Sequence, residues 1–168
     1  RMEAPVVVHV MTPKLFENTN SVCLAQGLSF QPGLRVETNC QNCGFQQVRI
    51  NGLDGPYTQL LLDGKALFSS LNGVYGIEQI PAGMIERVEV MRGGGSALYG
   101  ANAIGGTVNI ITKEPLNNLF MISHNLIAIG NSAYDNTTSL NASLINGQRN
   151  AGLYIFGTSR HRQHYDHD

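Results

Sequence analysis

Hydrophobic and polar residues follow strand-like patterns along the first two thirds of the chain. Apolar β-branched or alternating stretches predict strands at residues 6–10, 34–38, 47–50, 59–62, 87–91 and 108–112. Thr12 followed by Pro13 predicts the N-terminus of a short helix that runs through Phe16. Ser21 is the predicted cap of a second helix that ends before Pro32. Strands mixed with short helices predict a small α+β domain with a mixed sheet.

The pattern changes after Pro115. Residues 119–129, 139–144 and 151–159 alternate between polar and apolar side chains, and Asn146-Gly147 begins a turn. Segments of about ten residues that alternate and are separated by turns are typical of outer-membrane β-barrel strands. In isolation, the same pattern also fits a water-soluble antiparallel meander.

Composition excludes several classes of protein. Of the 168 residues, 42% are hydrophobic and only 14% are charged, and the formal net charge is −1. This balance gives no basic field for nucleic acid. No apolar run approaches the roughly 20 residues of a membrane-spanning helix. The chain opens without a signal peptide and stops in mid-pattern, so we expect it to be part of a longer polypeptide.

The most informative stretch is residues 84–112, MIERVEVMRGGGSALYGANAIGGTVNIIT. It reads as a strand, a glycine-rich turn, a segment of small residues and a second strand. This stretch closely resembles the plug domain of TonB-dependent outer-membrane receptors. Further motifs similar to that family occur in the family's order at residues 48–53, 60–65, 77–87 and 112–115. Two positions depart from the pattern: Asn51 replaces the usual Arg of an "IRG" motif, and Gly94 replaces a Pro.

The resemblance implies a domain organisation and a function. We expect a plug domain over residues 1–115, with a small mixed sheet and short helices, followed at residues 116–168 by antiparallel first strands of an incomplete transmembrane β-barrel. We expect part of an outer-membrane receptor that binds a scarce nutrient, such as an iron-siderophore, haem, cobalamin or another metal complex. Import would use energy supplied by TonB.

The resemblance also implies partners and the absence of catalysis. Expected partners are the receptor's own C-terminal barrel, outer-membrane lipid, the nutrient, and TonB, bound through a segment N-terminal to this chain. A TonB box is not recognisable here. We expect no enzyme activity, no cofactor, no bound metal and no nucleic acid. The alternative function is a secreted ligand- or metal-binding module that uses a CxxC pair as a clasp.

Cys40 and Cys43 form that CxxC pair. A structural disulfide in an oxidising compartment is the preferred interpretation. Contact with the ligand, redox chemistry and free thiols are the alternatives; a zinc site needs more ligands than two. Cys23, on the apolar side of a predicted helix, is expected to be a buried free thiol.

The family resemblance supplies the other candidate site residues. The apical loops of the plug would form the floor of the ligand site, through Cys40, Gln41, Asn42, Cys43, Phe45, Ser69, Ser70 and Asn72. Arg49 and Arg92 would lock the plug by pairing with carboxylates of the barrel. A solvated strand charge is the alternative for Arg49.

Two further motifs have simple structural interpretations. The three glycines at residues 93–95 lack the Lys of a phosphate-binding loop, so they predict a tight turn. The His- and Asp-rich segment at residues 161–168 is interpreted as a polar loop; a place at the extracellular mouth, where it could meet a cationic ligand, is the alternative.

Overall fold

The structure, a computed structural model, describes residues 7–40, 45–67, 77–129 and 133–163. The chain divides into two compact units, Arg1–Thr112 and Lys113–Asp168. None of the helices in the described residues has the length and apolar character needed to cross a membrane.

The first unit mixes strands and short helices, which confirms the predicted α+β class. Its helices are α1 (Pro13–Asn18), α2 (Leu24–Leu28) and α4 (Ser96–Tyr99), with 3₁₀ turns η1 (Gly55–Tyr57), η2 (Ala82–Met84) and η3 (Ala101–Ala103). Its strands are β1 (Val8–Met11), β2 (Leu34–Cys40), β3 (Phe45–Ile50), β4 (Thr58–Leu62), β5 (Lys65–Ala66), β6 (Ile85–Arg92) and β7 (Gly106–Thr112).

The described strands of this unit form a five-stranded sheet in the order β1-β6-β7-β4-β5 and a separate β2–β3 pair. β7 pairs antiparallel with β6 and parallel with β4, which makes the sheet mixed. The pairing register places Val90, Val108 and Leu60 in one row across the sheet. Val90 and Val108 are fully buried, so this row belongs to the core.

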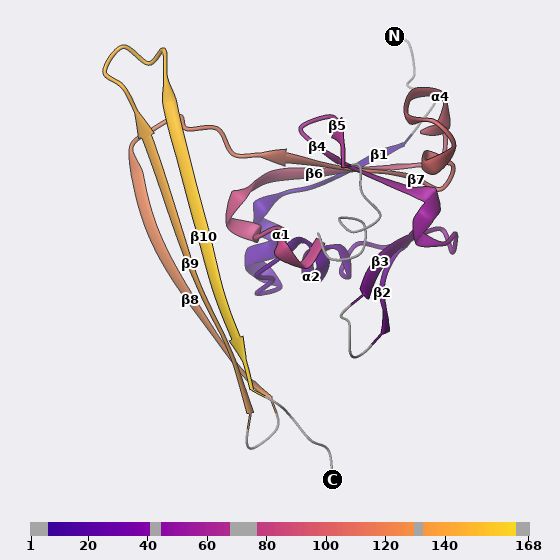
Figure 1. Ribbon diagram of the computed structural model, residues 1–168, viewed down its shortest axis with the longest axis horizontal. Helices are drawn as coiled ribbons and strands as arrows, with labels where there is room; N and C mark the ends of the chain where they lie inside the picture. The colour runs from indigo at the N-terminus through magenta and orange to yellow at the C-terminus, as the bar shows by residue number, and fades with distance from the viewer. Residues whose placement is uncertain (1–6, 41–44, 68–76, 130–132, 164–168) are drawn as a thin grey trace. The chain divides into compact units, whose positions relative to one another are not determined.

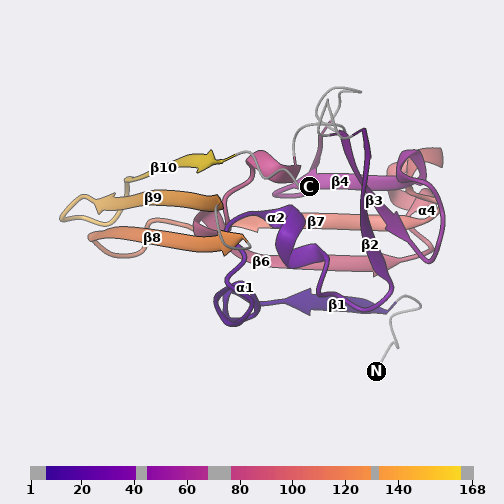
Figure 2. The ribbon, with the colours of Figure 1, turned by 90° about the horizontal axis from the view of Figure 1, so that it is seen from below.

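Helices α1 and α2 and the β2–β3 pair cover one face of the sheet (Figures 1 and 2). Leu24 and Leu28 of α2 are fully buried there, and Phe16 of α1 is nearly so. Burial of these side chains removes apolar surface from water, the main force that holds such short helices in place.

The helix starts differ in part from the prediction. Pro13 is the first residue of α1 and Thr12 stands at the N-cap position, but the Thr12 side chain makes no capping hydrogen bond. The predicted cap at Ser21 is wrong, because the residue before α2 is Cys23. The Ser21 hydroxyl is instead 2.7 Å from that of Thr19, where it is held near the end of α1.

The second unit consists of strands β8 (Leu119–Ile129), β9 (Ala133–Ile145) and β10 (Gly152–Arg162). The described residues form an antiparallel sheet in the order β10-β9-β8, without slips in register. β10 continues through His161 and Arg162, so these two residues belong to a strand and not to the predicted polar loop.

The two faces of this sheet differ in polarity. Every second residue of β9, beginning with Asp135, faces one side, and most of them are polar and buried: Asp135, Thr137, Asn141 and Ser143. The opposite side carries exposed apolar residues from all three strands: Phe120, Ile122, Leu126, Leu140, Leu144, Leu153 and Ile155. We call these the polar face and the apolar face. β9 thus alternates between polar and apolar residues as barrel strands do, whereas the polar face also carries exposed Leu119, Met121, Ile127 and Phe156 from β8 and β10.

Candidate functional site

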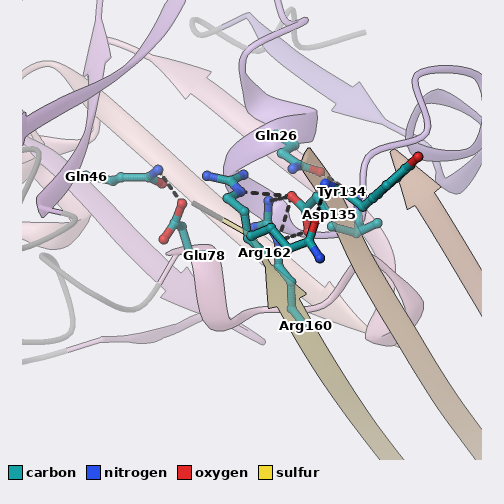
Figure 3. A network of polar contacts seen from close by, with 9 residues as sticks. Gln26, Gln46, Glu78, Tyr134, Asp135, Arg160 and Arg162 are labelled. Atoms are coloured by element: carbon teal, nitrogen blue, oxygen red, sulfur yellow. Dashed lines mark hydrogen bonds and ion pairs between the residues drawn. The ribbon is translucent and has the colours of Figure 1, made fainter. Parts of the chain in front are cut away.

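A hydrogen bond connects the flanks of the two predicted ligand loops. The side-chain amide of Gln46 donates to Glu78 at 2.5 Å (Figure 3). Gln46 is the last residue of the first predicted loop, residues 40–46, and Glu78 lies two residues after the second, residues 66–76. The bond therefore brings together two stretches of chain that are 32 residues apart in sequence.

Most of the predicted ligand residues are outside the described part of the chain, namely Gln41, Asn42, Cys43, Ser69, Ser70 and Asn72. Cys40 and Phe45 are described as backbone and pair with each other at the end of the β2–β3 hairpin. The strands thus extend further into the predicted loop than the sequence pattern indicated. The proposed Cys40–Cys43 disulfide also lies outside the described residues, whereas Cys23 is buried, as predicted.

One acceptor beside these loops has no partner among the described residues. The side-chain oxygen of Gln46 is buried and accepts no hydrogen bond from them. Buried amide oxygens nearly always accept a bond from protein or water. A hydrogen-bond donor is therefore expected beside the Gln46 side-chain oxygen, next to the predicted floor of the ligand site.

Arg49 is engaged inside the first unit. Its Nε is 2.6 Å from the Glu37 carboxylate and its Nη1 is 3.1 Å from that of Asp54. Arg35 also pairs with Glu37, at 3.0 Å. Arg49 therefore ties the β2–β3 pair to the turn before η1, and the alternative of a solvated strand charge does not describe it.

Arg92 has a different environment at the end of β6. Its guanidinium donates to the backbone carbonyl of Pro32 and lies against Gly33. Its Nε is buried and finds no acceptor among the described residues. A buried cationic donor without an acceptor is costly, so Arg92 remains suited to a carboxylate from elsewhere in the protein.

Sequence reasoning did not single out the polar network at the end of β7. The Asp63 carboxylate accepts hydrogen bonds from the Thr112 backbone N–H at 2.9 Å and from its hydroxyl at 2.8 Å. Next to it, the Gly64 N–H donates to the Asn109 side chain, which in turn donates to Glu89. The Asp-Gly pair after β4 was the available signal, since Asp and Gly favour the left-handed conformation that both adopt here.

A second cluster was missed on the polar face of the three-stranded sheet. Arg160 and Arg162, both on β10, point toward Asp135 on β9 (Figure 3). Arg160 forms a two-pronged bond through Nε and Nη2, the shorter at 2.6 Å, and Arg162 donates from Nε at 3.0 Å. The spacing of the two arginines, two residues apart on one strand, was the signal for a shared partner.

Nothing in the described ranges suggests a metal centre: no group of three or more His, Cys, Asp or Glu side chains lies close enough together to hold an ion. The geometry instead consists of structural ion pairs, a hydrogen bond between Gln46 and Glu78 and a three-stranded sheet with exposed apolar residues.

Known proteins resemble this chain in sequence and in fold. A sequence model of the TonB-dependent receptor plug domain matches residues 1–107. The chain is 36% identical over 105 residues to the vitamin B12 transporter BtuB of Vibrio vulnificus, covering 62% of this chain and 17% of the relative. It is 33% identical over 125 residues to a ferric enterobactin receptor of Pseudomonas aeruginosa, covering 67% of this chain and 17% of the relative.

Solved structures agree. The siderophore receptor PirA of Acinetobacter baumannii matches with a TM-score of 0.72 and 25% identity, over 91% of this chain and 24% of that one. A mutant of the ferric enterobactin receptor PfeA of Pseudomonas aeruginosa matches with a TM-score of 0.71 and 28% identity, over 94% of this chain and 24% of that one. The chain therefore spans about a quarter or less of the proteins that it matches.

The ordered motifs of residues 48–115, the mixed sheet they build and the match over residues 1–107 lead to one conclusion: the chain belongs to the TonB-dependent receptor plug domain family.

Proposed function

We propose that this chain is the plug and the first barrel strands of an outer-membrane receptor that imports a scarce nutrient with energy from TonB. The single observation that carries the proposal is the family match over residues 1–107. The alternation of polar and apolar residues along β9 supports the barrel part. A plug alone would fit any receptor of the family, and the exposed apolar face of the β8–β10 sheet supports contact with lipid.

The nutrient belongs to the class of iron-siderophores, haem, cobalamin or other metal complexes. Two relatives are named for vitamin B12 and ferric enterobactin, and these are the first ligands to examine. The Gln46–Glu78 bridge supports one shared ligand floor, because it joins the flanks of both predicted loops. We assign contacts to Cys40, Gln41, Asn42, Cys43, Phe45, Ser69, Ser70 and Asn72 on this basis.

The two parts of the chain have different roles in the proposed receptor. Residues 1–115 act as the plug inside the barrel lumen, and residues 116–168 belong to the barrel wall; TonB contacts a segment N-terminal to this chain. Arg92 locks the plug to a barrel carboxylate; its Nε, which finds no acceptor within the described ranges, supports this role. We propose the same role for Arg49, although it already forms ion pairs with Glu37 and Asp54.

No observation favours the alternative of a secreted module with a CxxC clasp. A module in water would have to cover the apolar face of the β8–β10 sheet, where Phe120 and Ile122 are 65% and 61% exposed. Family membership also indicates transport and not catalysis.

Uptake by the full-length receptor tests the proposal. Cells that lack other receptors are grown on limiting iron or cobalamin, with each candidate ligand supplied in turn, in the presence and absence of TonB. We expect the receptor to support growth on at least one ligand only when TonB is present. Growth that does not depend on TonB, or no uptake of any metal complex by correctly inserted receptor, would contradict it.

A matched pair of variants tests the lock. Arg92→Ala in the full-length receptor should let small antibiotics pass or lower uptake, whereas Arg35→Ala, which removes a mostly exposed arginine of the same domain, should not. Equal permeability of both variants and the parent would remove Arg92 from the lock.

A further inference from the structure

The register of β8, β9 and β10 sorts the apolar face into rows of side chains that lie next to one another across the sheet. Three consecutive rows contain no polar side chain. They are Leu144–Leu153, then Phe120–Ala142–Ile155, then Ile122–Leu140–Gly157. The large side chains in these rows are exposed, so this part of the face has no cover within the described residues.

The next two rows on the same face are mostly polar. His124, Thr138 and Ser159 form the first of them, and all three are exposed. Leu126, Asn136 and His161 form the second, so five of these six residues are polar. On β9 and β10 the change from apolar to polar side chains occurs in one step. On β8 the polar step is His124 alone, and Leu126 and Ala128 follow it on the same face.

His124 shows why this step matters energetically. Its Nδ1 is 2.9 Å from the Thr138 hydroxyl, which satisfies one ring nitrogen. The second ring nitrogen still needs a partner, because each nitrogen of imidazole either donates or accepts a hydrogen bond. Hydrocarbon offers none, whereas water and lipid headgroups do.

The height of the apolar rows can be compared with a membrane. Rows on one face of a strand are spaced by two residues, about 7 Å along the strand, or about 5 Å along the membrane normal for strands tilted by about 45°. Three rows therefore span about 15 Å, less than the usual apolar band of about 25 Å. A band of the usual height would enclose His124 and His161, whereas local thinning of the bilayer costs little for each Å.

We propose that contact of this sheet with hydrocarbon ends at the His124–Thr138–Ser159 row, and that this row and the Asn136–His161 row face polar lipid headgroups. The inference rests on the proposed outer-membrane barrel and adds where the lipid boundary lies on its wall. It also places a band of thinned bilayer beside the first three strands.

Nitroxide labels at single cysteines in the full-length receptor, reconstituted in phospholipid vesicles, test the boundary. Leu140→Cys and Ile155→Cys report on the apolar rows, and Thr138→Cys and Ser159→Cys report on the first polar row. Collision with oxygen, which concentrates in hydrocarbon, is compared with collision with a water-soluble nickel complex. The receptor without an added cysteine gives the background from Cys23, Cys40 and Cys43, and the far-ultraviolet circular dichroism spectrum of each variant shows that it is folded.

The expected result is a severalfold higher ratio of oxygen to nickel collisions at positions 140 and 155 than at positions 138 and 159. Equal, oxygen-dominated ratios at all four positions would place the polar row inside hydrocarbon and overturn the boundary while leaving the barrel intact. Nickel-dominated ratios at all four positions would overturn the barrel itself, and the boundary with it.

Discussion

The carboxylate of Asp63 holds both the backbone N–H and the hydroxyl of Thr112, at 2.9 and 2.8 Å. Thr112 is the last residue of β7 and the last residue of the first unit. Asp63 occupies the turn between β4 and β5. In the sheet, β4 lies next to β7 on the side opposite to β6, and β5 lies beyond β4. The turn therefore fixes the point at which the chain leaves the plug sheet for the β8–β10 strands.

Replacing Asp63 should loosen this exit. Asp63→Ala removes both acceptors and also places Ala in a left-handed conformation, since φ is +49°. We expect a local loss of about 1–3 kcal/mol, measured as an increase of about tenfold or more in hydrogen exchange at the Thr112 amide. Asp63→Asn keeps one acceptor and tolerates this φ. Its exchange rate at the Thr112 amide should therefore lie between that of the parent protein and that of Asp63→Ala. Unchanged exchange in Asp63→Ala would show that the turn does not hold β7.

Arg92 and Gly33 supply a second prediction, with a matched control in Gly52. Both glycines have left-handed φ angles, +78° and +82°. An added Cβ at Gly33 would lie 2.8 Å from Arg92 Cζ, whereas at Gly52 it would meet nothing within 4 Å. Each change to Ala should cost about 1–2 kcal/mol of backbone strain. Gly33→Ala should cost about 1 kcal/mol more, because it displaces the guanidinium from the Pro32 carbonyl.

Urea denaturation followed by circular dichroism measures this difference in the free energy of unfolding. In a background of Arg92→Ala the two glycine substitutions should cost the same, because the obstructing side chain is gone. A persistent excess for Gly33→Ala in that background would show that something other than Arg92 occupies the space.

The strands near the centre of the fold were predictable because their side chains repeat with the period of a strand. Residues 87–91 and 108–112 were predicted, and β6 and β7 cover Ile85–Arg92 and Gly106–Thr112. β9 was predicted only at residues 139–144 but begins at Ala133. Its first half contains Asp135 and Asn136, which are poor strand formers. Pairing with both β8 and β10 recruits this half into the sheet, and a local pattern does not report such pairing.

The site was less predictable than the fold, for a related reason. The Arg92–Pro32 contact joins residues 60 positions apart, and the Gln46–Glu78 bond joins residues 32 apart. The residues next to Gln46 and Glu78 in the sequence form no pattern that indicates this contact. Family resemblance located Arg92, but only the fold shows that one end of its guanidinium is occupied and that Nε has no acceptor in the described part of the chain.

The CxxC pair gives a third prediction, carried over from the sequence. In receptor exported to an oxidising compartment, Cys40 and Cys43 should be joined and Cys23 should be reduced. After denaturation without reductant, a thiol reagent should label Cys23 alone, and reductant should expose the other two. Cys43→Ser is the control, because it should release the Cys40 thiol without reductant. Labelling of all three cysteines in unreduced, exported parent protein would exclude the disulfide.

The last prediction concerns Asp135, which is shared by two arginines of unequal exposure. The Arg160 side chain is 23% exposed and binds through two nitrogens, whereas that of Arg162 is 58% exposed and binds through one. Exposed ion pairs contribute about 0–1 kcal/mol, and two-pronged, less exposed pairs contribute more. Double-mutant cycles with Asp135→Asn, Arg160→Gln and Arg162→Gln, measured by unfolding of the full-length receptor in detergent, isolate each pair. We expect about 1–3 kcal/mol of coupling between Asp135 and Arg160 and less than about 1 kcal/mol between Asp135 and Arg162. Equal coupling in both cycles, or the reverse order, would mean that exposure and geometry do not decide which arginine holds this carboxylate.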